Sequence, residues 1–318
     1  MQNAAPAFCF ADHLPREWAV NLLVEGCPSD LWQERLAEAL DALNATFVNV
    51  GANKGYKIPP FLSVHDAALL AVNPKAWHVA ILDFAKRKSS GQLKWISCGG
   101  GCRDCDEPPV KPHQRERRPT VHALELVPHN AELIEALANA TGVGHRVRVH
   151  NLAVSNISGV TPMMTTTGAL RYGSEIESIC LHKNTSRCRM GSLGWQRAEP
   201  IFVEQTTVDR FFAHEGLRHT SHVSIDVEGW DPLVLEGMAR VLRERRSDTI
   251  EFEYIARGYW AHPLRRSRLR PRQDGVVPKR ERRKLRDVLT TLGSLGWECY
   301  FQVGAALLTQ PLQLQPQP

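Results

Sequence analysis

Short apolar runs alternate with amphipathic segments along this chain, and the alternation predicts its secondary structure. Apolar residues recur at helical spacing in five places: residues 29–43, 77–84, 130–140, the segment that begins at 231, and 285–292. Runs of strand length occupy residues 46–50, 121–125, 146–149, 222–226 and 249–254. Strands that alternate with helices favour an α/β fold, with helices on both faces of a mainly parallel sheet.

The same pattern predicts the extent of the domain. Two closing runs, 298–303 and 305–308, flank Gly304 and indicate a C-terminal hairpin. We therefore expect a Rossmann-like, doubly wound, mainly parallel seven-stranded sheet within residues 45–310, after a helical N-terminal extension (1–44) and before a tail (311–318). Residues 155–200 show no regular pattern, and two insertions interrupt the domain, a Cys-containing one at about 88–119 and a basic one at about 257–286.

Charge is distributed unevenly over the 318 residues. The formal net charge is +5, but twelve Lys or Arg and two acids lie between Arg257 and Arg286, so this segment carries +10 and the remainder −5. The basic segment either attracts an anionic acceptor or forms a solvated linker. Tyr259 and Trp260 are its only aromatic residues, so a stacking surface for nucleic acid is poorly supported.

The apolar runs are too short for a transmembrane helix, which needs about 20 apolar residues. Residues 1–10 do not resemble a signal peptide, and a chain of this length needs no disulfides to hold its core. We therefore expect a soluble protein in a reducing, cytoplasmic compartment. Three of its eight cysteines, Cys9, Cys27 and Cys299, stand apart from the others.

Three cysteines cluster in the first insertion, separated by three and then two residues. Thiolates at such spacing can share one structural zinc ion. His113 is the nearest candidate for a fourth ligand, and Cys180 and Cys188 are alternatives. A loop without metal is an equally good interpretation, and we expect the insertion on the face away from catalysis. The three clustered residues are Cys98, Cys102 and Cys105.

Unusual groups follow three of the predicted strands. The first strand runs into a glycine turn, residues 51–55, the second ends in Glu125, and the third leads to Ala153. Ligands of doubly wound sheets bind beyond the C-terminal ends of the strands. Glycines allow a close backbone approach, an acid can accept hydrogen bonds from ribose hydroxyls, and small apolar residues can flank adenine. Each feature alone fits an ordinary strand end, but together they indicate a nucleoside site.

These residues resemble the motifs of the FkbM-type methyltransferases. Asn49 stands where the family has Asp, and the insertion before residue 120 is a second departure. Asn53 replaces the second glycine of a dinucleotide-binding turn, so a pyrophosphate is less well matched than adenosylmethionine. The resemblance covers about residues 46–55 and 120–256, with the motifs in family order at 49–55, 125–130, 151–155, 206–211, 225–237 and 250–254.

The resemblance implies a class I methyltransferase that uses S-adenosyl-L-methionine and methylates a hydroxyl on a sugar, glycan or natural product. Asp226 and Glu228, two residues apart at a strand end, are the candidates for a general base or for holding the acceptor hydroxyl. Glu251 and Glu253 repeat this spacing, and a divalent cation bound by the four carboxylates is an alternative. The residues implied in cofactor binding are Asn49, Gly51, Ala52, Asn53, Gly55, Glu125, Ala153 and Asp226.

Two other functions fit parts of the sequence. Asn49 in place of Asp is compatible with a non-catalytic nucleoside-binding protein on the same fold. The basic segment is compatible with a nucleic-acid methyltransferase. However, the fourth strand runs into Asp226-Val227-Glu228-Gly229, and not into the Asn/Asp-Pro-Pro-aromatic tetrad that amino-methylating enzymes often carry.

Overall fold

The computed structural model describes seven parts of the chain, residues 5–11, 45–88, 118–165, 199–255, 258–260, 282–303 and 306–307. The predicted helix at 29–43 lies outside the described residues. So do the three clustered cysteines of the first insertion, their candidate fourth ligands, and most of the basic segment.

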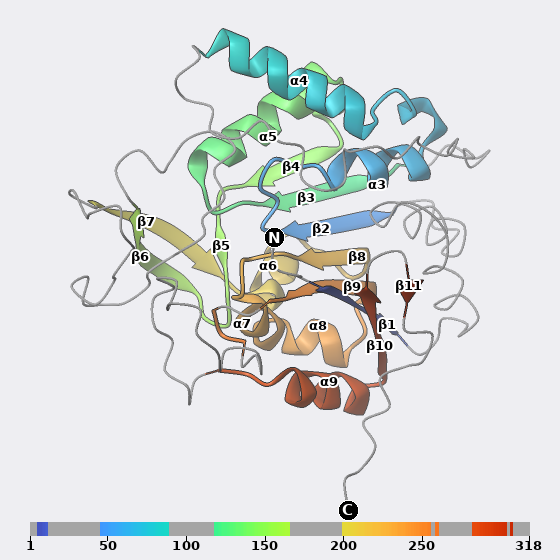
Figure 1. The fold of residues 1–318 in the computed structure, drawn as a ribbon, viewed down its shortest axis with the longest axis vertical. Helices are drawn as coiled ribbons and strands as arrows, with labels where there is room; N and C mark the ends of the chain where they lie inside the picture. The colour runs from blue at the N-terminus through green and yellow to red at the C-terminus, as the bar shows by residue number, and fades with distance from the viewer. Residues whose placement is uncertain are drawn as a thin grey trace, which may run out of the picture.

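The described strands form an eight-stranded main sheet with the order β11-β10-β1-β9-β8-β2-β3-β4. Five neighbouring strands of this sheet, from β9 to β4, are parallel, as the alternation of strands and helices predicts. Figure 1 shows them side by side across the middle of the molecule. The five are β9 (Ser247–Tyr254), β8 (Thr220–Ile225), β2 (Thr46–Val50), β3 (Thr120–Leu124) and β4 (Val147–His150).

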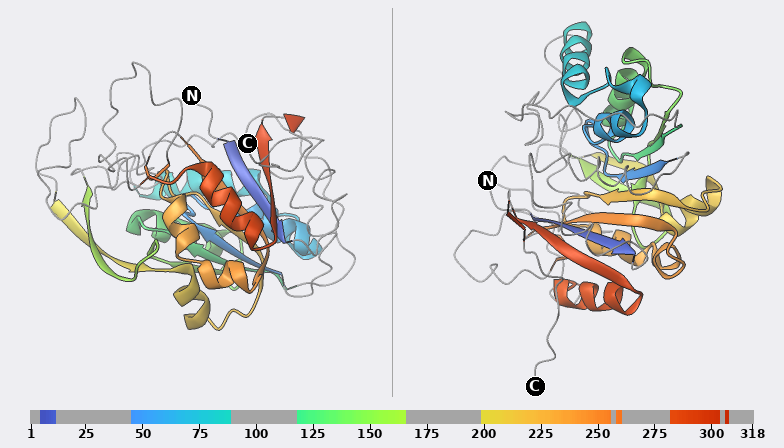
Figure 2. Two further views of the ribbon diagram at one scale, coloured as in Figure 1. Left: turned by 90° about the horizontal axis from the view of Figure 1, so that it is seen from below. Right: turned by 90° about the vertical axis from the view of Figure 1, so that its right-hand side faces the viewer.

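The antiparallel edge of the main sheet differs from the prediction. Strand β1 (Ala5–Ala11) pairs with both β9 and β10 (Trp297–Val303), so residues 5–11 belong to the sheet and not to a helical extension. Figure 2 shows β1 beside β10. Strand β11 (Ala306–Leu307) completes the expected hairpin with β10, and β1 makes the sheet larger than seven strands.

A disulfide joins Cys9 of β1 to Cys299 of β10, which lie opposite each other in the strand register. The expectation that these two cysteines stand alone is therefore wrong. The two residues are 290 positions apart, so their pairing depends on the sheet and not on any local spacing.

A second, three-stranded sheet has the order β5-β7-β6. Its strands are β5 (Ala153–Val154), β6 (Gly159–Thr165) and β7 (Glu199–Thr206). Strand β6 and the start of β7 lie in the region 155–200, for which the sequence shows no regular pattern, and residues 166–198 lie outside the described residues. Strand β5 begins three residues after β4 ends, and the small sheet therefore lies at the C-terminal edge of the parallel strands (Figure 1).

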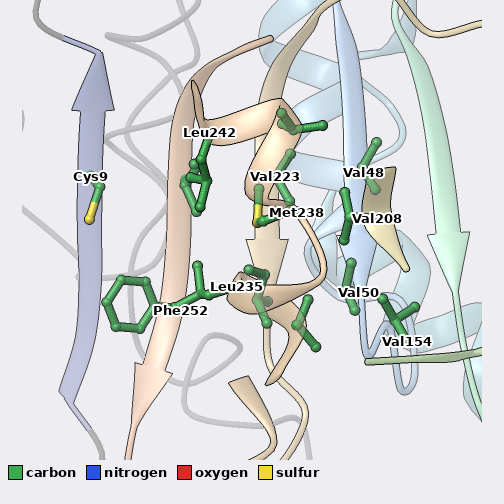
Figure 3. Packing of buried hydrophobic residues seen from close by; sticks show 14 of the residues in the cluster. Cys9, Val48, Val50, Val154, Val208, Val223, Leu235, Met238, Leu242 and Phe252 are labelled. Atoms are coloured by element: carbon green, nitrogen blue, oxygen red, sulfur yellow. The ribbon is translucent and has the colours of Figure 1, made fainter. Parts of the chain in front are cut away.

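Alternate residues of the parallel strands form two apolar cores, because successive side chains of a strand point to opposite faces. On one face, Val48, Val223 and Phe252 lie against Leu235 and Met238 (Figure 3). The helices that cover this face are α6 (Val208–His214), α7 (Asp231–Glu236), α8 (Ala239–Arg243) and α9 (Leu285–Ser294).

The opposite face is covered by helices from the first half of the chain. Phe47 and Val121 contribute to this core together with Trp77. Asn73 caps one of these helices by accepting a hydrogen bond from Ala76 N, and a proline follows it in the first turn, as helix starts favour. The helical elements of this layer are α3 (Ile58–His65), the short 3₁₀ helix Ala67–Leu69, α4 (Pro74–Arg87) and α5 (Pro128–Ala140).

None of the helices among the described residues combines the length and the apolar character that crossing a membrane requires.

The central position of Phe252 can be tested by substitution. Phe252→Ala should lower the free energy of unfolding by about 3–5 kcal/mol, because the fully buried ring leaves a cavity between β9 and its helices. Phe202→Ala, at a phenylalanine that is 71% exposed on β7, should change it by no more than about 0.5 kcal/mol. Urea denaturation measures both, and equal losses would contradict this assignment of the core.

Candidate functional site

The parallel register brings three strand ends to one edge of the sheet. Val50 of β2 lies opposite Leu124 of β3 and Ile225 of β8, so the residues that follow these strands are neighbours. Gly51 N donates to Leu124 O at 2.9 Å, and Asp226 N donates to Val50 O at 2.9 Å. The glycine turn and two predicted acidic positions, Glu125 and Asp226, therefore meet at the C-terminal edge.

Gly51 occupies a position that only glycine fits. Its φ of +80° lies in the left-handed region, and a Cβ atom there would overlap the carbonyl oxygen of Asp226. Gly55 also has a positive φ, but its missing side chain faces the protein interior, where a Cβ would lie 3.0 Å from Trp77 Cζ2. Ala52 is buried in the core beside α3. Gly51 is thus the glycine that lets two strand ends approach each other.

Glu125 is held in place by three hydrogen-bond donors. Its Oε2 accepts from Asn53 N at 2.6 Å and its Oε1 from Val127 N at 2.8 Å, and the side chain of Asn130 also donates to it. A carboxylate offers about four acceptor positions, so about one remains for a ligand. Burial raises the pKa of Glu125 to about 7, against the lowering effect of these hydrogen bonds.

Two asparagines at the first strand end carry buried oxygens without a hydrogen-bond donor. Asn49 is 1% exposed, and its Oδ1 has no donor among the described residues. The same holds for Oδ1 of Asn53, whose backbone adopts a left-handed φ of +51°. Buried polar atoms are nearly always hydrogen-bonded, so each oxygen indicates a ligand donor at this edge.

The third strand end lies beside Glu125. Asn151 Nδ2 donates to Glu125 O at 2.8 Å, and Leu152 N donates to the same oxygen at 3.2 Å. Ala153 follows directly as the first residue of β5. The structure thus brings together the ends of the first three predicted strands around Glu125, as the sequence analysis requires.

Lys57 lies among the carboxylates and was not predicted from the sequence as a site residue. Its Nζ is 3.2 Å from Glu251 Oε1 and 3.9 Å from Asp226 Oδ2, and it donates to Ser224 Oγ at 2.9 Å. Burial alone would lower the pKa of Lys57, but Glu251 and Asp226 raise it above its ordinary value. Its place two residues after the glycine turn was the available signal in the sequence.

Glu251 is fixed by a buried polar network. It accepts from Ser224 Oγ at 3.0 Å, and His222 Nε2 lies 3.5 Å from its Oε2. Burial would raise the pKa of Glu251, but Lys57 and His222 outweigh this effect and hold the pKa at about 2. Glu251 therefore acts as a buried anion that positions Lys57.

Asp231 and Glu253 form a second acidic group close to Asp226. The fully buried Asp231 accepts from Gly229 N at 3.1 Å and from Glu253 N at 3.0 Å. It therefore connects strand β9 to the loop that follows β8. Burial and then Asp226 raise the pKa of Asp231 to about 8. Burial, Asp226 and Asp231, in that order, raise the pKa of Glu253 to about 9.

Glu228 lies in the loop between these groups with an unusual backbone. Its φ is +58°, followed by +91° at Gly229, and the side chain is partly exposed. Left-handed non-glycine residues are uncommon and occur preferentially at functional sites. The loop thus turns sharply at the position where the sequence predicts a catalytic carboxylate.

The described ends of the basic segment are attached to this loop. Tyr259 N donates to Gly229 O at 2.8 Å, and Arg283 N donates to Tyr259 O at 2.6 Å. The guanidinium of Arg283 also binds Glu236 at the end of α7. The basic segment therefore leaves and rejoins the fold beside the site, as expected from its position after the fifth strand.

The close contact at Gly51 generates a prediction about stability. Gly51→Ala should cost more free energy of unfolding than Gly142→Ala, because both glycines have nearly the same φ, +80° and +79°, but a Cβ meets nothing within 4 Å at Gly142. Gly142→Ala, the control, should lower the free energy of unfolding by about 1–2 kcal/mol from backbone strain alone. Urea denaturation compares the two, and equal losses would show that the two strand ends do not restrict this position.

The raised pKa of Glu253 generates a prediction about pH. The folded protein keeps this proton up to about pH 9, while the unfolded chain loses it near pH 4.5, so the free energy of unfolding falls between these values as pH rises. Glu253→Gln should make the free energy of unfolding depend less on pH in this range. Denaturation between pH 5 and 9 measures it, with Glu204→Gln on the exposed side of β7 as a control that keeps the parent profile. A parent-like profile for Glu253→Gln would refute the assignment.

Comparison with known proteins supports the resemblance seen in the sequence. The model of the methyltransferase FkbM domain matches residues 49–270, which is more than half of the chain and includes the C-terminal ends of β2, β3, β4 and β8. No curated protein and no solved structure matches the chain significantly. The glycine turn, the carboxylate at the second strand end and the acidic loop after β8 all lie in the matched region, and the chain belongs to the FkbM methyltransferase domain family.

Proposed function

We propose that this protein transfers the methyl group of S-adenosyl-L-methionine to a hydroxyl oxygen of a sugar, glycan or natural product. The supporting observation is the edge at which Gly51, Glu125 and Asp226 meet, with Lys57 beside them. Family membership supports methyl transfer, and the carboxylates support a hydroxyl as the acceptor.

The residues at the strand ends fit a nucleoside methyl donor. The side-chain oxygens of Asn49 and Asn53 are buried acceptors without a donor among the described residues. The amino groups of the cofactor can donate to them. Glu125 has about one acceptor position left for a ribose hydroxyl. In this proposal Asn49, Gly51, Asn53 and Glu125 hold the cofactor, and Ala153 lies beside its adenine.

The bound cofactor supplies an activated methyl group on sulfur, and the protein supplies orientation and proton removal. Asp226 accepts the proton of the acceptor hydroxyl, because its partly exposed carboxylate lies directly at the end of β8. Glu228 orients the acceptor from the same loop. Lys57, 3.9 Å from Asp226, offsets the negative charge that the surrounding carboxylates concentrate there.

Lys57 also bears on the question of a divalent cation. Its ammonium group lies between Asp226 and Glu251, where a metal bridging these acids would have to bind. We therefore propose that the acidic cluster works without a divalent cation. The attachment of the basic segment beside Gly229 supports an acceptor that carries negative charge.

Turnover with a labelled methyl donor tests the proposed chemistry. A panel of sugars, glycans and small hydroxyl compounds, with and without acidic groups, should yield labelled ethers, and added magnesium or manganese should not raise the yield. Asp226→Asn should lower kcat by about 10²–10⁴-fold, because the amide cannot accept a proton. Asp83→Asn, at an exposed acid on α4, should keep the parent rate.

The alternatives predict different results. A non-catalytic nucleoside-binding protein would bind adenosylmethionine in calorimetry without turnover on any acceptor. A nucleic-acid methyltransferase would bind RNA or DNA with an affinity that falls steeply with salt. Full activity of Asp226→Asn would contradict the role given to this residue.

A further inference from the structure

Two histidines and a glutamate converge on the face of the sheet opposite Lys57 and Glu251. His122 lies in β3, His150 ends β4, and Glu215 follows α6 directly. The distance from His122 Nδ1 to His150 Nε2 is 3.1 Å, and from His122 Nδ1 to Glu215 Oε2 it is 3.8 Å. One possible ligand atom from each residue lies within 4.8 Å of the other two.

These separations suit a single metal ion. Zn–N and Zn–O bonds of about 2.0–2.2 Å in a tetrahedral arrangement place two ligand atoms roughly 3.3 Å apart. The distances from His122 Nδ1 to His150 Nε2 and to Glu215 Oε2 lie on either side of this value. Two imidazoles and one carboxylate are also a donor set that divalent first-row metals accept, with a further position left for water.

The surroundings keep the two histidines in this arrangement. Their rings are nearly parallel, at 13°, and each meets the ring of Phe211 edge-on. The side chain of His122 is 3% exposed and that of Glu215 is 13% exposed. Groups that are packed in this way need little rearrangement to bind an ion, which lowers the cost of forming the site.

Glu215 also contacts two exposed basic side chains. Arg148 Nη1 lies 3.4 Å from its Oε2, and His214 Nδ1 lies 3.0 Å from its Oε1. Both side chains are mainly in solvent, at 65% and 80% exposure, so either can move when an ion neutralises the carboxylate. Arg148 therefore competes with a metal for Glu215 but does not block it.

We propose that His122, His150 and Glu215 form a binding site for a zinc ion that joins β3, β4 and the end of α6. The site is independent of the proposed methyl transfer. Its connection to the other face is structural, because His150 O accepts a hydrogen bond from Glu125 N at 2.9 Å. A zinc ion here would fix the strand end that carries Glu125.

Zinc titration of the full chain tests this site. Calorimetry should be done on protein in which Cys98, Cys102 and Cys105 are replaced by Ser, so that the cysteine cluster cannot take up the metal. We expect one zinc ion to bind. At a free zinc concentration a hundred times the Kd, it should raise Tm by roughly 4 °C. In this background, His150→Gln and Glu215→Gln should each weaken zinc binding by more than about tenfold, since even losing an outer-shell partner costs about 10–100-fold.

Two further variants serve as controls. His219→Gln, at a half-exposed histidine that pairs with Asp248, should keep the affinity. Arg148→Gln should strengthen binding, because it removes the competing cation from Glu215. Circular dichroism confirms folding of each variant, and Glu215→Gln alone carries the test if His150→Gln does not fold. Absence of zinc binding, or equal affinity with and without the Glu215 carboxylate, would overturn the proposal.

Discussion

Two backbones approach each other at Gly51 with no space for a side chain between them, and the arrangement of the candidate site follows from this contact. The carbonyl group of Asp226 occupies the volume that a Cβ atom of residue 51 would need. Because β2 and β8 are parallel neighbours, their ends can lie this close only if one turn lacks a side chain. The same turn presents Asn53 N to the carboxylate of Glu125.

Charge compensation is the second constraint on this edge of the sheet. Asp226, Asp231, Glu251 and Glu253 are close enough to shift one another's ionisation, and Lys57 is a cation that interacts with three of them. The pKa values of Glu251 and Glu253 shift in opposite directions. Glu251 contacts Lys57 and stays ionised, while burial keeps the more distant Glu253 protonated at neutral pH. Neighbouring groups with opposite shifts are characteristic of sites that move protons.

The two faces of the sheet are linked through the ends of β3 and β4. On one face Glu125 belongs to the candidate cofactor site, and on the other His122 and His150 belong to the proposed zinc site. The backbone hydrogen bond from Glu125 N to His150 O connects them. The two sites are therefore in direct backbone contact at the ends of these two strands.

The sequence by itself determined the parallel strands and the grouping of their ends. Residues 46–50 form β2 as predicted, and the ends of β3 and β8 lie within one residue of the predicted ends, because local apolar runs bounded by turn residues define a strand. The meeting of Gly51 with Glu125 followed from the rule that parallel strands end at one edge. Only the tertiary structure decided the partners of Lys57, the pairing of Cys9 with Cys299 and the place of β1. These depend on contacts between residues far apart in the chain, which local periodicity does not encode.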